Sequence, residues 1–203
     1  MHSAETPISP AGAFDLGAYR HDRSKSYLFK RGLWALFQPF FAAWTPRHLS
    51  PLRISLLRLF GAKIGSGCLV NSGVRIWDPW NLEMADHVWI GAEAKIYNLA
   101  KITIGSNSVV SQYSYLCAST HDYLDPTFPL YSKPIAIGAG VWVAANVFVA
   151  PGITIHDGAV VGACSVVTRD VPPNSVCAGN PCRFIKPRFG VKGAAGKAAE
   201  GGA

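Results

Sequence analysis

The chain has 203 residues, of which 49% are apolar and only 15% are charged, so its composition is that of a folded protein and excludes a disordered one. The 20 glycines and 14 prolines indicate frequent turns and favour many short strands. A net charge of +7 attracts polyanions such as nucleic acid, anionic lipid or a phosphorylated cofactor, and it does not distinguish among them.

The N-terminal third has no single pattern. Residues 1–24 show no period and no apolar signal-peptide core, so we expect an extended arm. Residues 25–62 interleave aromatic and basic side chains and contain a short amphipathic helix over Leu52–Phe60. The apolar run Leu33–Trp44 has 12 residues, too few to span a bilayer. These helices either cap the main domain, which we favour, or contact a membrane surface through residues 25–60.

Five cysteines are present, an odd number, and no two of them form a CxxC pair: Cys68, Cys117, Cys164, Cys177 and Cys182. This spacing matches neither a zinc site nor a disulfide framework. We therefore expect buried free thiols in a reducing compartment.

A six-residue period begins near residue 64. In the second half of the chain an aliphatic residue recurs at every sixth position: Ile137, Val143, Val149, Ile155, Val161 and Val167. The first half keeps this period with slips of two residues, for example between Ile102 and Ile104. Neither a helix nor a simple alternating strand produces a strict period of six, whereas a solenoid does.

The period predicts an all-β solenoid over residues 63–187. Three units of six residues form one triangular coil, with the β-branched aliphatics inside and the extra pairs of residues bulging out at corners. The period fails after Leu116 and resumes at Ile137, so the chain leaves the prism there, with a loop over residues 122–134. Prolines and a glycine end the solenoid, and residues 188–203 form a small, polar tail that we expect to be disordered.

The pattern resembles the hexapeptide-repeat acyltransferases, which form a left-handed parallel β-helix. The resemblance is strongest in "PIAIGAGVWVAANVFVAPGITIHDGAVVGACSVVTRDVPPNSVCAGNPCRFIK". Within that superfamily, "LLRLFGAKIGSG", "IWDPWNLEMADHVWIGAEAKIYNLAKITIG" and "YLCASTHDYLDPTFPLYSKPIAIG" resemble the colanic acid biosynthesis acetyltransferases. The handedness comes from the family and not from the period.

The stretch "STHDY" places His121 where the repeat breaks. A histidine at a rigid strand end beside a loop is well placed for catalysis. The resemblance implies that His121 is the general base that removes a proton from an acceptor hydroxyl. Asp122 either orients this histidine or binds acceptor hydroxyls, or it is an ordinary loop acid. Asn98 lies near the family's substrate-side asparagine or aspartate.

The resemblance also implies acetyl-CoA as the acetyl donor. Ala145 and Ala163 match small residues along the pantetheine arm, and Trp142 either lines the same cleft or is a packing residue. The remaining matches are polar or basic residues expected at the nucleotide phosphates: Thr168, Arg169, Arg183 and Lys186.

The resulting hypothesis is an O-acetyltransferase that acts on a saccharide of exopolysaccharide or cell-surface glycan synthesis. We expect a cytoplasmic homotrimer, with location at the inner membrane face and a lipid-linked acceptor left open, and we expect neither a metal nor a nucleic-acid partner. The alternatives are a non-enzymatic scaffold and a metal-dependent enzyme similar to carbonic anhydrase, for which His87 and His156 would be further ligands.

Overall fold

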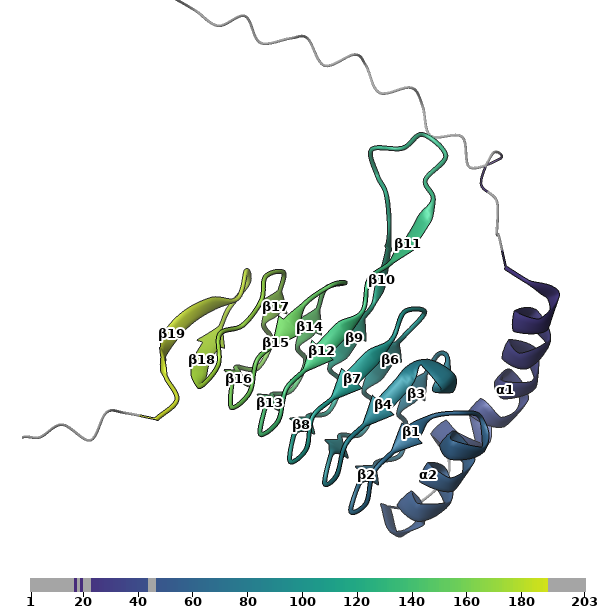
Figure 1. Ribbon diagram of the computed structural model, residues 1–203, viewed down its shortest axis with the longest axis horizontal. Coiled ribbons are helices and arrows are strands. Elements are labelled where there is room, and N and C mark those ends of the chain that lie inside the picture. Colours follow the sequence, from purple (N-terminus) through teal and green to yellow (C-terminus); the bar gives the residue numbers. More distant parts are fainter. Residues whose placement is uncertain (1–16, 18, 20–22, 44–46, 190–203) are drawn as a thin grey trace, which may run out of the picture.

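The computed structural model describes residues 17, 19, 23–43 and 47–189, and it describes no side chain between residues 40 and 47. Most of the expected N-terminal arm and of the expected tail lies outside the described residues. The described chain forms a β-solenoid with two helices at one end and a hairpin that stands out from its side (Figure 1).

Three parallel sheets form the three faces of the prism, which we call faces A, B and C. Face A contains β1 (Lys63–Ile64), β4 (Leu82–Met84), β7 (Ile102–Ile104), β12 (Ile135–Ile137) and β15 (Thr154–Ile155). Face B contains β2 (Leu69–Val70), β5 (Trp89–Ile90), β8 (Val109–Val110), β13 (Trp142–Val143), β16 (Val160–Val161), β18 (Ser175–Ala178) and β19 (Arg183–Pro187). Face C contains β3 (Arg75–Ile76), β6 (Lys95–Tyr97), β9 (Tyr115–Cys117), β14 (Phe148–Val149) and β17 (Val166–Val167).

The predicted aliphatic column is the core of the prism. On face B, Ile90, Val110 and Val143 stack in register on successive coils and are at most 1% exposed. Their β-branched side chains suit short strands that pack on three sides. The prediction of a β-solenoid with a short helical N-terminal segment is therefore confirmed.

The corners are built for close stacking of coils. Three residues before an inward-facing aliphatic, the backbone repeatedly adopts a positive φ, as at Asn107 (57°) and Asn146 (57°). At Gly105, directly after the inward-facing Ile104, the residue must be small, because a Cβ atom there would lie 2.5 Å from the carbonyl carbon of Gly138 on the next coil. Buried Ser114 ties adjacent coils together by donating to the Ala144 carbonyl and accepting from the Val147 amide.

The slips in the repeat all fall on one edge of the prism, where face C passes into face A. In the first two coils this edge carries two additional residues, including the short 3₁₀ helix η2 (Pro79–Asn81). Each of these slips shifts the six-residue period by two positions. The shift is accommodated on face A, where one strand points two residues inward, as Ile102 and Ile104 do. The predicted bulges at corners are thus present, and they stack along a single line.

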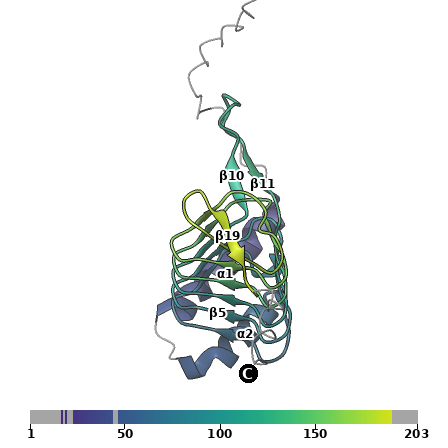
Figure 2. The same ribbon diagram turned by 90° about the vertical axis from the view of Figure 1, so that its left-hand side faces the viewer.

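On the third coil this edge carries the largest insertion. Where a loop over 122–134 was expected, the chain forms an antiparallel hairpin of β10 (Ser119–His121) and β11 (Leu130–Ser132). The hairpin projects away from the solenoid in both views (Figures 1 and 2). Its strands lack the aliphatic alternation that predicts a strand, since Ser119, Thr120 and His121 pair with Ser132, Tyr131 and Leu130.

The helices α1 (Lys25–Ala43) and α2 (Ser50–Leu59), with η1 (Arg47–Leu49) between them, cover the N-terminal end of the solenoid (Figure 1). Their side chains donate hydrogen bonds to the open edge of the first strand in each of the three sheets. The Ile64 carbonyl accepts from Arg58, the Val70 carbonyl from Arg53, and the Ile76 carbonyl from Trp34 and Gln38. An uncovered parallel edge would expose these groups to other chains, so capping is the structural role of the segment.

The two helices also bear on the membrane hypothesis. No helix in the described part of the chain combines the length and the apolar character needed to cross a bilayer. Helix α1 nevertheless exposes large apolar side chains: Leu28, Phe29, Leu33, Leu36 and Phe37.

The five cysteines are free, as expected, but their predicted burial is only partly correct. Cys117 and Cys177 are buried, Cys68 and Cys182 are half-buried, and Cys164 is exposed. Cys164 occupies a corner position with a φ of 59°, where the side chain points away from the column. The six-residue period alone does not reveal this exposure.

Candidate active site

His121 is the last residue of β10, on the protruding hairpin and partly exposed. Its Nδ1 lies 2.8 Å from the carbonyl oxygen of Phe128, and its ring stacks on the Phe128 ring at a centroid distance of 4.3 Å. A carbonyl oxygen only accepts, so Nδ1 carries the hydrogen and donates it. In the neutral ring this leaves the lone pair on Nε2, which can then accept a proton from a substrate.

Phe128 adopts an uncommon backbone conformation, with a φ of 50°. This conformation belongs to the hairpin tip, which is also held by Asp125, whose carboxylate accepts from both the amide and the hydroxyl of Thr127. The backbone amide of Thr127, followed by its hydroxyl, lowers the pKa of Asp125, so the tip remains ordered by an ionised carboxylate at neutral pH.

Asp122 does not contact the imidazole through any described hydrogen bond. Its Oδ1 accepts from the Leu124 amide, and its own amide donates to the Pro129 carbonyl. Of the roles that the sequence left open for Asp122, the geometry favours that of an ordinary loop acid that forms a turn. The Phe128 carbonyl, and not Asp122, orients the His121 imidazole.

Asn98 lies on the same edge as His121, one coil nearer the N-terminus, but it is fully buried. Its Oδ1 accepts from the Asp78 amide, and its Nδ2 donates to the Asp78 carbonyl at 2.6 Å. Both polar atoms of the side chain are therefore occupied in fixing the edge of the preceding coil. The predicted catalytic role of Asn98 remains a prediction, and the structure assigns it a positioning role.

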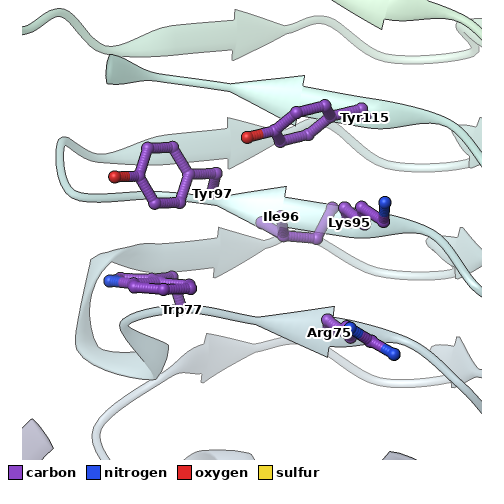
Figure 3. Close-up of a pocket in the computed structure, with 6 residues that line it drawn as sticks. All are labelled: Arg75, Trp77, Lys95, Ile96, Tyr97 and Tyr115. Atoms are coloured by element: carbon purple, nitrogen blue, oxygen red, sulfur yellow. The ribbon is translucent and has the colours of Figure 1, made fainter. Parts of the chain in front are cut away.

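Two adjoining pockets run along this edge. The first is lined by Arg75, Trp77, Lys95, Ile96, Tyr97 and Tyr115, all on face C or its edge (Figure 3). The second shares Trp77 and Tyr97 and extends to α1 and the hairpin through Arg23, Tyr27, Leu28, Arg31, Leu99 and Leu130. Because Leu130 is the register partner of His121, the second pocket reaches the outer end of the histidine's strand pair. We call the two together the basic aromatic groove.

Under the groove lies a buried carboxylate, Asp78. The Tyr27 hydroxyl donates to it at 3.0 Å, and the Arg31 guanidinium lies 3.7 Å away. Burial raises the pKa of Asp78 to about 6, even though Tyr27 and Arg31 act in the opposite direction. Burial, followed by the charge of Asp78, raises the pKa of Tyr27 to about 12, so Tyr27 remains a hydrogen-bond donor.

The predicted cofactor residues lie farther along the solenoid toward the C-terminus. Ala145 and Ala163 occupy the same corner on successive coils, where the Ala145 carbonyl accepts from the Cys164 amide. Arg183 and Lys186 are exposed on β19, which pairs with β18. Thr168 and Arg169 are exposed directly after β17, and Trp142 is half exposed on face B, with its indole nitrogen donating to Ser111.

The structure does not group these residues into one closed pocket within the single chain. They lie at three places: the corner of the two alanines, the edge of Thr168 and Arg169, and the outer strand of Arg183 and Lys186. Small residues at a corner leave room for an extended arm, and the exposed cations suit phosphates. These residue types fit coenzyme A chemically.

His87 and His156 are corner residues. His87 has a φ of 58° at the turn before β5, and His156 directly follows β15. Among the described residues, no group of three or more His, Cys, Asp or Glu side chains is placed to hold a metal ion.

The groove residues were not predicted from the sequence. Trp77, Tyr97 and Arg31 appear there as ordinary aromatic and basic residues, and Arg31 is far from the other two along the chain. A usable signal did exist, because the repeat slips next to Trp77 and next to Tyr97 as it does next to His121. Three insertions at the same phase of a solenoid stack on one edge.

Comparison with known proteins agrees with this fold. The family model described as bacterial transferase hexapeptide (six repeats) matches residues 134–169. The "Putative colanic acid biosynthesis acetyltransferase WcaF" of Escherichia coli (strain K12) is 47% identical over 156 residues, covering 77% of this chain and 86% of that protein. The chain therefore belongs to the hexapeptide-repeat acetyltransferase family.

Other relatives extend the comparison. The galactoside O-acetyltransferase of Escherichia coli (strain K12) is 34% identical over 137 residues, which are 66% of this chain and 68% of that protein. A solved galactoside acetyltransferase in complex with coenzyme A superposes with a TM-score of 0.77 at 30% identity, covering 83% of this chain and 86% of that one. A maltose O-acetyltransferase from Clostridium difficile 630 gives a TM-score of 0.71 at 28% identity, covering 81% and 89%.

Proposed function

We propose that this protein transfers an acetyl group from acetyl-CoA to a hydroxyl of a saccharide in exopolysaccharide or cell-surface glycan synthesis, with His121 as the general base. The observation that carries the proposal is the hydrogen bond from His121 Nδ1 to the Phe128 carbonyl, on a hairpin whose Leu130, the register partner of His121, lines a groove with an aromatic wall. The relatives named as acetyltransferases of colanic acid synthesis and of galactosides support the substrate class.

In this reaction the proton of the acceptor hydroxyl moves first to His121 and then to the leaving thiolate. Nε2 of His121 takes the proton from the acceptor hydroxyl as its oxygen attacks the thioester carbonyl. The carbon–sulfur bond then breaks, and the imidazolium returns the proton to the departing thiolate. The hydrogen bond to Phe128 and the stacked ring hold the imidazole in one orientation throughout. Because the acceptor hydroxyl attacks the thioester directly, no nucleophilic cysteine or serine is required.

On the donor side, acetyl-CoA supplies the activated acetyl group. Ala145 and Ala163 would leave room for the pantetheine arm along their shared corner. Arg183 and Lys186, with Thr168 and Arg169, would bind the phosphates. Trp142 would line the same cleft from face B.

The test compares wild type with His121→Ala. We expect both proteins to bind acetyl-CoA and desulfo-CoA in calorimetric titration, while the variant loses about 10²–10⁴-fold in the rate of CoA release with a saccharide acceptor. His87→Ala, at a corner away from the groove, is the matched control and should retain the rate. Absence of CoA binding by wild type would overturn acetyl-CoA as the donor. An unchanged rate in His121→Ala would overturn His121 as the general base.

We also propose a homotrimer with active sites between subunits, as the family resemblance implies. The outward residues of face B support an association surface, because Trp89 and Trp142 are 48% and 49% exposed in the single chain. Light scattering should give three times the 21.8 kDa chain mass. A monomer at micromolar concentration would contradict this assembly.

Membrane contact through residues 25–60, with a lipid-linked acceptor at the cytoplasmic face, is a further part of the proposal. It is supported by the exposed apolar face of α1, beside which Lys25 and Lys30 are exposed. Flotation with anionic liposomes tests it, with Phe29→Ser and Leu36→Ser as variants on the exposed face. Wild-type protein that stays at the bottom of the gradient would exclude this contact.

A further inference from the structure

The basic aromatic groove carries charge that an acetyl transfer to a neutral sugar does not need. Four cations line it: Arg23 and Arg31 on the side of α1, and Arg75 and Lys95 on face C. No acidic residue is among the residues that line either pocket. The groove therefore presents a positive potential, and it reaches the strand pair of His121 through Leu130.

The aromatic wall divides these cations into two pairs. Trp77 and Tyr97 lie on successive coils with ring centroids 5.0 Å apart, and they belong to both pockets. Figure 3 shows them one above the other, with Arg75 and Lys95 each two residues earlier along the chain. The two rings meet edge to face, at an interplanar angle of 75°. This pair offers an apolar surface to a sugar ring, while the flanking cations can bind its substituents.

Two contacts fix the position of the Arg31 guanidinium. Its guanidinium lies over the Trp77 ring at 4.3 Å, and its Nε faces the buried carboxylate of Asp78. Its Nη1 atom is buried and has no hydrogen-bond partner among the described residues. A buried guanidinium nitrogen without an acceptor is costly, and an anionic ligand oxygen would supply the acceptor.

The charges under the groove do not cancel the four cations. Asp78 is the single carboxylate that the described contacts place against Arg31, and it is shared with the Tyr27 hydroxyl. Arg75 and Lys95 have no described carboxylate partner, and both are exposed on the outer side of face C. The groove thus keeps a net positive charge at neutral pH.

We infer that the acceptor is an anionic saccharide, whose carboxylate or phosphate is bound by the cations of the basic aromatic groove while its ring packs on Trp77 and Tyr97. This inference rests on the proposed function, since it concerns the acceptor of the same His121. It makes Arg31, Arg75 and Lys95 determinants of acceptor specificity rather than catalytic residues.

The test uses three probes of matched size: methyl glucoside, methyl glucuronide and glucose 1-phosphate. Binding to the full-length protein is measured by calorimetry, and acetyl transfer by release of CoA. We expect at least one anionic probe to bind about 10-fold or more tightly than the neutral glycoside, because a charge-assisted contact exceeds a neutral one by about 1.4 kcal/mol or more. The two anionic probes separate a carboxylate from a phosphate as the recognised group.

The variants are Arg31→Gln and the double variant Arg75→Gln with Lys95→Gln. Arg31→Gln leaves buried Asp78 without its cation and can destabilise the fold, so the exposed double variant provides an independent measurement. Either variant should reduce the preference for the anionic probe by about 10-fold and leave CoA affinity unchanged. Lys63→Gln on face A removes the same charge away from the groove and should retain the preference.

The outcomes separate the two claims. Equal affinity for anionic and neutral probes, or a preference that neither groove variant alters, overturns the anionic acceptor and leaves the acetyltransferase proposal intact. A clear anionic preference in binding without acetylation of any saccharide supports the groove and overturns the proposed reaction. A loss of preference in Lys63→Gln equal to that of the double variant shows a general charge effect and also overturns the inference.

Discussion

The two ends of the solenoid are closed in different ways. At the N-terminal end, side chains of α1 and α2 donate to the carbonyls of Ile64, Val70 and Ile76. At the C-terminal end, closure is mainly by backbone: β19 pairs antiparallel with β18, and the Cys182 amide donates to the Val166 carbonyl. Closure by helices fills space with large buried side chains, whereas closure by a strand leaves its outer surface free.

The difference extends to the proposed site. The helical end delivers Arg23, Tyr27 and Arg31 to the acceptor groove, so its stability and its specificity share residues. The strand end presents Arg183 and Lys186 on an exposed strand, where they can be changed without disturbing the core. We therefore expect substitutions at the first end to affect folding and those at the second to affect binding.

The largest effect is expected for Trp34→Ala. Trp34 is fully buried, packs against Phe60 and donates to the Ile76 carbonyl, so its removal should cost about 3–5 kcal/mol of unfolding free energy. Phe184→Ala on β19, where the side chain is 57% exposed, should stay within about 0.5 kcal/mol. Urea denaturation of both variants measures the contrast, and equal losses would contradict the difference between the two ends.

The next effect is a pH dependence at Asp78. The folded protein binds this proton more tightly than the unfolded chain, because burial raises the pKa of Asp78 to about 6. Its contribution to stability is therefore complete below about pH 4 and is lost as the pH rises through about 6. Relative to Asp78→Asn, wild type should lose about 3 kcal/mol between pH 4 and pH 7.

Unfolding free energies of the two proteins at pH 4 and pH 7 provide the measurement. The difference between the proteins is the informative quantity, since other groups titrate equally in both. A constant difference across this range would show that Asp78 has the same pKa in the folded and unfolded chains.

The next substitution, Arg188→Ala, tests the C-terminal end of the solenoid. Arg188 donates to the carbonyls of Gly140 and Gly158 and is only half-buried, so its loss should cost about 1 kcal/mol. Arg53 makes the corresponding contact to Val70 but is 1% exposed, so Arg53→Ala should cost more. Thermal unfolding of the pair ranks them, and an Arg188 variant less stable than the Arg53 variant would reverse our order.

The smallest effect is expected for Lys186→Ala. Its exposed ammonium would lose one contact to a phosphate of CoA, worth about 1 kcal/mol or less, and the dissociation constant should rise about 5-fold. The melting temperature should not change, since the side chain is exposed on the outer strand. Calorimetric titration with CoA tests this, and an unchanged affinity would remove Lys186 from the donor site.

The sequence by itself determined the solenoid, because a strict period of six admits few other backbones and each aliphatic of that period is found in the core. It also located His121, since the break in the period marks where the chain leaves the prism. It did not show that the break contains a hairpin, because the strand Ser119–His121 has no alternating apolar pattern and is stabilised by its partner strand.

Only the tertiary structure decided which residues form the basic aromatic groove. Arg31, Trp77 and Tyr97 come from α1 and from two coils, and they meet because stacking of the coils places equal phases of the repeat on one edge. The same stacking buried Asn98 against the Asp78 backbone. The hairpin, in turn, gave His121 its orienting contact to a backbone carbonyl rather than to Asp122. Sequence period fixes the face on which a residue lies, whereas its partners depend on distances between coils that the period does not contain.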